Sequence, residues 1–414
     1  NNYTQRVNIF NEEEFLVFEK EDLLIFRDWN NVEVVTFTYD LLSGYLIAKN
    51  LFKFIDSEEK LNELIKSTKF KNELLNRKTC HPLFNDILRS FCVLAIKKFG
   101  LSFYSSIKNE TLNDYLLKSI FEVNQKKIID NKSVAVNIIK ENFKDFNKHN
   151  LIFNQFKNTE LDSQNPLNID LLSNLLFNMK VSDRDLSWTE YIRSNNFVRD
   201  NEYKKFLNGF EVACKSKTKF KTDKVHLAAK KTMWFLTSTN REFRDLSTRA
   251  LYYYGQKYPD KFLELVLYSL SINDPYVWER TLAAMYGVVM AKHSTDDNFK
   301  KLFLPRIALT IFESIFKKEA PFSTTHILAR DYASKTIEIG LLHHNDLLKP
   351  EEVLLTTAPF TIGGNRNPNE FDHEKEEGIF SEPISMDFSN YTIGRIVEGG
   401  HSYSDPPEKK KVRR

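Results

Sequence analysis

The chain has 414 residues, and its 59 basic and 56 acidic side chains leave a net charge of +3. This balance argues against a dedicated nucleic-acid binder, which usually shows a strongly basic face. No run of 18 apolar residues is present, so no membrane-spanning segment is expected. Three widely spaced cysteines (Cys80, Cys92 and Cys214) predict neither a disulfide framework nor a zinc site, which favours a reducing, cytoplasmic location. Only 12 glycines and 12 prolines in a chain that is 42% hydrophobic favour a mainly α-helical fold.

The first expected unit is a small α+β unit that covers residues 1–58. Residues 31–39 (NVEVVTFTY) are rich in β-branched and aromatic side chains, which predicts a strand. A second short strand is expected at residues 23–26. Asp40 is expected to cap a helix whose apolar positions continue to Phe52.

Helices are expected to fill the second region, residues 59–222. Ser57 precedes one helix with Leu61 and Ile65 on its apolar side, and Pro82 is expected to begin another with a wide apolar stripe. Further helical periods are predicted at residues 112–126, 133–146, 168–179 and 187–208.

A stretch of seven lysines lies near the end of this region, between Cys214 and Lys231. A solvated loop that leads into a helix is the favoured interpretation, because lysine runs are usually solvated. A patch for nucleic acid or for an acidic partner is the alternative.

Residues 223–355 show the most regular pattern and predict HEAT-like helical repeats. Two segments align without a gap at an offset of 33, which matches Asn240 to Asn273 and Tyr253 to Tyr286. Pro275 suits a first helical turn, with Asn273 or Asp274 as its cap. Small residues recur one turn apart, and a looser third copy runs from His326 to Gly340. Such a period is typical of stacked helix pairs of the HEAT, armadillo or TPR kind, and chance similarity between amphipathic helices is the alternative.

Residues 356–414 predict a long surface loop and the start of a further helical region. Glycines and the motif NPN at residues 367–369 precede an acidic run at residues 372–377. Loops this long are often functional. The tail KKKVRR (residues 409–414) resembles a nuclear-import peptide, but the start of another helix is favoured. Because Asn1 is not Met and the tail ends in a charge run, we expect both ends to be cuts in a larger protein; processing or recombinant expression could also explain the start.

No catalytic, cofactor-binding or metal site is predicted for this segment. The sequence contains no GxxxxGK[ST] phosphate loop, no GxSxG elbow and no HExxH pair. His343 and His344 with Asp346 mimic a metal cluster, but adjacent helical residues point about 100° apart and do not converge on one ion. Cys80 with His81 resembles a nucleophile pair, and a buried thiol at a helix start is favoured instead. The motif DHE at residues 372–374 is better explained as part of a solvated charge run.

Charged residues on the repeat-like helices have two interpretations. Arg241, Arg244 and Asp245 lie on one expected helix, and Glu279 and Arg280 lie on the next. A ladder of ion pairs that holds stacked helices in register is favoured over contact with a ligand. The partner-binding residues therefore stay unassigned at this point.

Four short blocks carry a resemblance to a known family: residues 37–48 (FTYDLLSGYLIA), 237–245 (TSTNREFRD), 273–280 (NDPYVWER) and 387–395 (DFSNYTIGR). The first resembles the element that follows the nucleotide-binding core of STAND (NACHT-like) ATPases, where an aromatic-rich strand end leads into a helix ending in Tyr-Leu-Ile-Ala. The other three resemble bacterial antiviral STAND proteins, the Avs (AVAST) anti-phage sensors. The long middle, about 60–220, carries no motif of that family.

The resemblance implies a three-part parent protein. An effector would precede an ATPase that uses ATP and Mg²⁺, and a C-terminal helical-repeat region would sense a phage protein such as a terminase or portal subunit. Target binding would drive ATP-dependent homo-oligomerisation, often to a tetramer, and activate the effector. This segment would contain the end of the ATPase module, a winged-helix-like unit at residues 1–58, and much of the sensor, with no cofactor of its own. We expect the contact region at residues 224–342 and in the loop at residues 360–387.

Two other functions remain open at this point. One is a helical-repeat adaptor without any linked ATPase, which a phosphate loop upstream of Asn1 in the full gene would argue against. The other is an enzyme that uses His343, His344 and the loop at residues 360–387, which bound metal or activity lost in His344→Ala would support.

Overall fold

The computed structural model describes residues 17–29, 32–107, 109–196, 201–216 and 222–358. These residues fall into two compact units. One contains those up to Phe312 together with His326–Leu348, and the other contains Glu313–Thr325 and the residues from Lys349 onward. Most of the described chain is helical, which confirms a mainly α fold. No helix in the described ranges has the length and apolarity needed to cross a membrane.

A β-hairpin and a helix form the N-terminal part of the described chain. Strand β1 (Leu24–Trp29) pairs antiparallel with β2 (Val32–Phe37), which confirms the strand predicted within residues 31–39. Helix α2 (Asp40–Leu51) follows. The prediction that Asp40 caps this helix is wrong, because Asp40 already lies in the first turn and Tyr39 occupies the cap position without a side-chain hydrogen bond. At that position the carboxylate still favours the helix through its interaction with the helix dipole.

The helices that follow, up to residue 215, are α3 (Glu58–Lys66), α4 (Thr68–Phe70), α5 (Phe84–Phe99), α6 (Glu110–Glu122), α7 (Gln125–Asp130), α8 (Lys132–Asn142), α9 (His149–Phe156), α10 (Ile169–Phe177), α11 (Val181–Arg184), α12 (Glu190–Asn196) and α13 (Glu202–Lys215). Ser57 caps α3 by accepting from the backbone N–H of Lys60, as the sequence indicates. Helix α5 begins two residues later than expected, because Pro82 lies in a turn in which His81 Nδ1 accepts from the Leu83 N–H at 3.0 Å.

The prediction of one continuous helical period at residues 187–208 is wrong. A π-helical segment, η5 (Asp185–Thr189), leads into α12, and α13 begins separately at Glu202. The Asn201 side chain accepts from the Tyr203 N–H at 2.8 Å and so caps α13. Asparagine forms such local bonds more readily than it continues a helix, which explains the new start.

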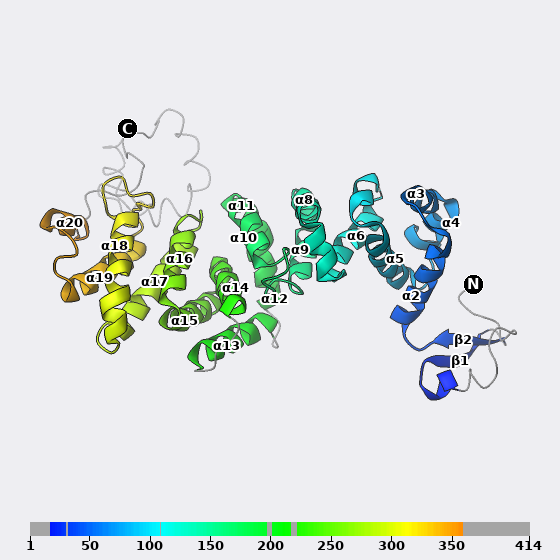
Figure 1. Ribbon diagram of the computed structural model, residues 1–414, viewed down its shortest axis with the longest axis horizontal. Coiled ribbons are helices and arrows are strands. Elements are labelled where there is room, and N and C mark those ends of the chain that lie inside the picture. The colour runs from blue at the N-terminus through cyan, green and yellow to red at the C-terminus, as the bar shows by residue number, and fades with distance from the viewer. Residues whose placement is uncertain (1–16, 30–31, 108, 197–200, 217–221, 359–414) are drawn as a thin grey trace, which may run out of the picture. The chain divides into compact units, whose positions relative to one another are not determined.

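The remaining helices are α14 (Thr222–Trp234), α15 (Arg241–Lys257), α16 (Pro259–Leu270), α17 (Pro275–Lys292), α18 (Leu304–Ile315), α19 (Ile327–His343) and α20 (Pro350–Leu355). Within the first unit, α13, α15, α17 and α19 are neighbours in that order, and we call them the helix row (Figure 1). Helices α14 and α16 pack against this row.

The buried positions of the helix row show that the offset of 33 predicted between the two repeat-like segments is wrong. Caps and buried positions of α15 and α17 correspond at an offset of 34 rather than 33, with Asn240 matching Asp274. Fully buried Ala250 likewise corresponds to Ala284, whereas the tyrosines matched at offset 33 are only half-buried. The difference arises because Asp274 caps α17 while Asn273 binds another side chain, described below. His326 caps α19 in the same way through the Ala329 N–H.

Candidate functional site

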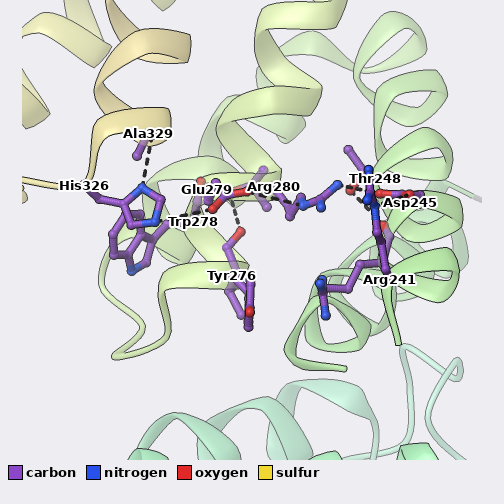
Figure 2. Close-up of polar contacts among 12 residues, drawn as sticks. Arg241, Asp245, Thr248, Tyr276, Trp278, Glu279, Arg280, His326 and Ala329 are labelled. Carbon is purple, nitrogen blue, oxygen red and sulfur yellow. Dashed lines mark hydrogen bonds and ion pairs between the residues drawn. The ribbon is translucent and has the colours of Figure 1, made fainter. Parts of the chain in front are cut away.

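Charged side chains near the starts of three helices of the row connect these helices (Figure 2). Arg280 of α17 donates from Nη1 to Asp245 Oδ1 of α15 at 2.6 Å. Beside it, Glu279 lies 3.4 Å from Arg280 Nε and, through its other oxygen, 3.4 Å from His326 Nε2 at the start of α19. The predicted ladder between the first two helices is therefore confirmed, and it extends to α19.

The members of this ladder differ in their contribution to stability. The Arg280 side chain is 22% exposed and the Glu279 side chain 10%, so their charges interact in a partly dehydrated environment. Arg241 also approaches Asp245, at 3.8 Å, but its side chain is 85% exposed. Exposed pairs of this kind contribute little, because water and salt screen them. Arg241 therefore keeps a guanidinium that can contact a partner.

Aromatic side chains lie beside the ladder. The Arg244 guanidinium is 4.2 Å from the centroid of the Tyr276 ring, and its Nη1 donates to the Ser238 carbonyl at 2.5 Å. The Trp278 ring meets the His326 imidazole edge-on at 5.0 Å. Arg244 is thus held by a carbonyl and a ring rather than by an acidic residue, in contrast to its expected place in the ladder.

Large side chains at these helix starts remain exposed to solvent. Tyr276 is 46% exposed, Ile327 is 77% exposed, and Leu328 is exposed as well. We call this surface the start face, and it consists of Arg241, Tyr276, Trp278, Arg280, His326, Ile327 and Leu328. Tyrosine, tryptophan and arginine are the residues that most often dominate protein–protein binding energy. The start face therefore exposes residue types that are common at protein–protein interfaces.

The histidines near the end of α19 do not converge. His343 Nε2 lies 3.0 Å from His293 Nδ1, whereas His344 Nε2 lies 2.8 Å from the Lys300 carbonyl oxygen. Burial lowers the pKa of His343, and the neighbouring His293 lowers it further. Because the two adjacent imidazoles have different partners, they are not brought together with Asp346. Among the described residues, no group of three or more His, Cys, Asp or Glu side chains is arranged to hold a metal ion.

Cys80 and His81 make separate contacts in the turn before α5. The Cys80 thiol lies 3.6 Å from the Arg77 carbonyl, while His81 Nδ1 is occupied by the Leu83 N–H. Burial lowers the pKa of His81. The expectation of a buried thiol is wrong, because Cys80 lies in a turn where its side chain is half-buried. The acidic motif at residues 372–374 and the loop at residues 360–387 lie outside the described residues.

Part of the lysine stretch is structural. Lys230 pairs with Asp170, and Lys231 is buried and pairs with Glu160. Burial lowers the pKa of Lys231 and raises that of Glu160, and each partner opposes the shift of the other. The interpretation as a solvated stretch is therefore wrong for Lys231, which the helical continuation of α14 carries into the core.

A buried arginine that the sequence did not single out joins two distant parts of the first unit. The Arg184 side chain has no exposed surface and lies 3.5 Å from Asp274 Oδ2. Burial lowers the pKa of Arg184 and raises that of Asp274, while the opposite charges counteract both shifts. Arg184 also donates two hydrogen bonds to Asn273, which precedes the cap of α17, and one to the Leu176 carbonyl. A lone arginine in a four-residue helix gives no sequence signal for such a long-range contact.

Comparisons with protein-family models, with curated proteins and with solved structures return no significant match. The choice of the start face as the candidate site therefore rests on its own residues. They come from three consecutive helices of the row, and they include exposed side chains of the types that are frequent at protein–protein interfaces.

Proposed function

We propose that the chain is the C-terminal sensor and scaffold part of an antiviral STAND ATPase, and that the start face helps to recognise a phage protein of the terminase or portal type. One observation carries this proposal. Two of the blocks that resemble the Avs family, residues 237–245 and 273–280, meet at the start face through the hydrogen bond between Asp245 and Arg280. The resemblance and the surface chemistry thus fall on the same residues.

The helix row supplies the architecture for such a sensor. We propose that its side-by-side packing is that of a HEAT-like solenoid, in which repeated helix pairs offer an extended surface for another protein. The β1–β2 hairpin followed by α2 supports a winged-helix-like end of the ATPase module at residues 1–58. The ATP, the Mg²⁺ and the oligomerisation, often to a tetramer, belong to the parent protein.

A capture experiment tests the start face directly. The immobilised chain is exposed to lysates of phage-infected and uninfected bacteria, and retained proteins are identified by mass spectrometry. The native chain should retain one phage structural or packaging protein from the infected lysate only. Tyr276→Ala combined with Ile327→Asp should lose it, because both side chains are exposed and lie away from the core.

A matched control separates recognition from general stickiness. Tyr39 is 57% exposed and Leu186 is 69% exposed, and neither belongs to the start face. Tyr39→Ala combined with Leu186→Asp should keep the captured protein. Equal capture by both double variants would remove the start face from the proposal, and deletion of residues 360–387 would then test the loop.

The same experiment separates the sensor from the adaptor without a linked ATPase. Host proteins retained equally from both lysates, with no phage protein, would overturn the sensor and favour the adaptor. A phosphate loop in the gene upstream of Asn1 would favour the sensor independently of any capture.

A further inference from the structure

A cavity of about 690 Å³ lies far along the chain from the start face, among residues of α8, α9, α10 and α11. Pockets of this size are typical of small-molecule sites in proteins. Neither the ladder nor the resemblance to the Avs family involves its lining residues.

Positive charge dominates the wall of this cavity. Lys140, Lys144 and Lys180 line it with one carboxylate, that of Asp183. Lys144 is held by Glu141 at 2.7 Å, whereas Lys140 and Lys180 make no ion pair within the described residues. Two exposed ammonium groups that form no ion pair at one cavity, where lysines outnumber carboxylates, attract an anion.

An aromatic cluster forms another part of the wall. Phe146 is 49% exposed, and its ring centroid is 5.1 Å from that of His149. The buried Phe143 ring stacks on His149 at 4.3 Å. The exposed Phe146 ring therefore remains available for a flat ligand, since aromatic rings pack favourably in offset or tilted arrangements.

His149 adds a buried polar atom without a partner. The residue is 6% exposed, and its Nε2 lies 2.8 Å from the Phe143 carbonyl oxygen. A carbonyl only accepts, so Nε2 carries the hydrogen of this bond. Nδ1 has no hydrogen-bond partner among the described residues. The His149 ring is therefore held beside the exposed Phe146 ring by its Nε2 hydrogen bond.

We propose that this cavity binds a small aromatic anion, a planar ring that carries a phosphate or a carboxylate. The ring packs against Phe146, and the anionic group lies between Lys140 and Lys180. This inference is independent of the sensor proposal, because it rests on different residues and on a different class of ligand.

Calorimetric titration of the 414-residue chain tests the ligand class. Adenosine monophosphate, phenyl phosphate and benzoate carry a ring and a charge, adenosine carries the ring alone, and inorganic phosphate carries the charge alone. At least one aromatic anion should bind ten times more tightly than adenosine and inorganic phosphate. Preference for the two phosphates over benzoate, or the reverse, identifies the anionic group. The proposal is overturned if no aromatic anion binds at millimolar concentration, or if inorganic phosphate binds as tightly as they do.

Substitutions place the binding in the cavity. Lys140→Glu combined with Lys180→Glu should weaken the best probe at least tenfold, and Phe146→Ala should do the same. Lys66→Glu combined with Lys69→Glu is the matched control, because both lysines are exposed and lie on α3 and α4. All of these side chains are exposed, so the fold should be kept, which circular dichroism verifies. Equal affinity of both charge-reversed variants would place the probe elsewhere and overturn the proposal.

Discussion

The guanidinium of Arg184, which has no solvent-exposed surface, donates a hydrogen bond of 2.7 Å to the side-chain oxygen of Asn273, 89 residues further along the chain. The same guanidinium also donates to the Asn273 backbone carbonyl. Asn273 is thereby held in place before α17, and the adjacent Asp274 caps the helix through the Tyr276 N–H. The position at which α17 begins is therefore set jointly by a local cap and by a distant arginine.

Replacing Arg184 should strongly lower the free energy of unfolding. Arg184→Leu leaves the buried carboxylate of Asp274 without its charged partner, and removing one side of a buried pair costs about 3–5 kcal/mol. Urea unfolding followed by circular dichroism should show a loss in this range. Arg193→Leu is the control, because Arg193 and its partner Glu190 are about half-exposed and should cost less than about 1 kcal/mol. Equal losses in the two variants would contradict the structural role of Arg184.

The ladder can be measured by a double-mutant cycle. Asp245→Ala, Arg280→Ala and the double variant should give a coupling energy of about 0.5–1 kcal/mol, because the pair is only partly exposed. The coupling should decrease in 1 M NaCl, where screening is strong. The corresponding cycle for Arg241 and Asp245 should give a coupling near zero, since Arg241 is almost fully exposed. A larger coupling for Arg241 than for Arg280 would contradict the geometry.

Replacing two helical glycines by alanine should have opposite effects on stability, because only one of them lies against a neighbouring helix. A Cβ at Gly340 of α19 would lie 2.5 Å from Ala308 Cβ of α18, so Gly340→Ala should destabilise by about 1–3 kcal/mol. A Cβ at Gly209 in α13 would meet nothing within 4 Å. Gly209→Ala should therefore stabilise by about 0.5–1 kcal/mol, the usual preference for alanine in a helix. Thermal unfolding of both variants measures the difference, and a rescue of Gly340→Ala by Ala308→Gly would verify its cause.

His226 predicts a contribution to the pH dependence of stability. Burial lowers its pKa, Lys261 lowers it further, and Asp223 and Glu264 oppose this shift. As the pH falls, His226 is therefore protonated first in the unfolded chain, near pH 6.5, and only at lower pH in the folded chain. The contribution of His226 is fully present above that pH and is lost as the pH falls through its folded-state pKa. The destabilisation between pH 7.5 and pH 5.5, measured by urea unfolding, should be smaller in His226→Gln. An equal or larger destabilisation would contradict this sign.

Local signals in the sequence were sufficient for much of the fold. The β-branched run within residues 31–39 becomes β2, and Ser57 caps α3, because both depend on a few neighbouring residues. The separate start of α13 at Glu202 is not evident from the sequence, because apolar positions on both sides of Asn201 follow a helical period. The offset of 33 between the segments of α15 and α17 is one residue short, because identical side chains recur at 33 whereas buried positions recur at 34.

The candidate site was predictable only in part. The charges of Asp245 and Arg280 one helix apart indicated their pairing, since the repeat period placed them on adjacent helices. The contact between His326 and Glu279 is not evident from the sequence, because the third helix starts at a different spacing. The burial of Lys231 and Arg184 depends on partners 71 and 90 residues away, for which a single sequence gives no pattern.

The caps of the helix row are unevenly spaced, with 34 positions from Asn240 to Asp274 and 52 from Asp274 to His326. The longer connection includes Glu313–Thr325, which belongs to the second compact unit. Yet α19 buries the same kinds of positions as α15 and α17. The contacts that join members of the row are thus compatible with both the short and the long connection. The packing of the row therefore depends on the buried side chains of its helices and not on the length of chain between them.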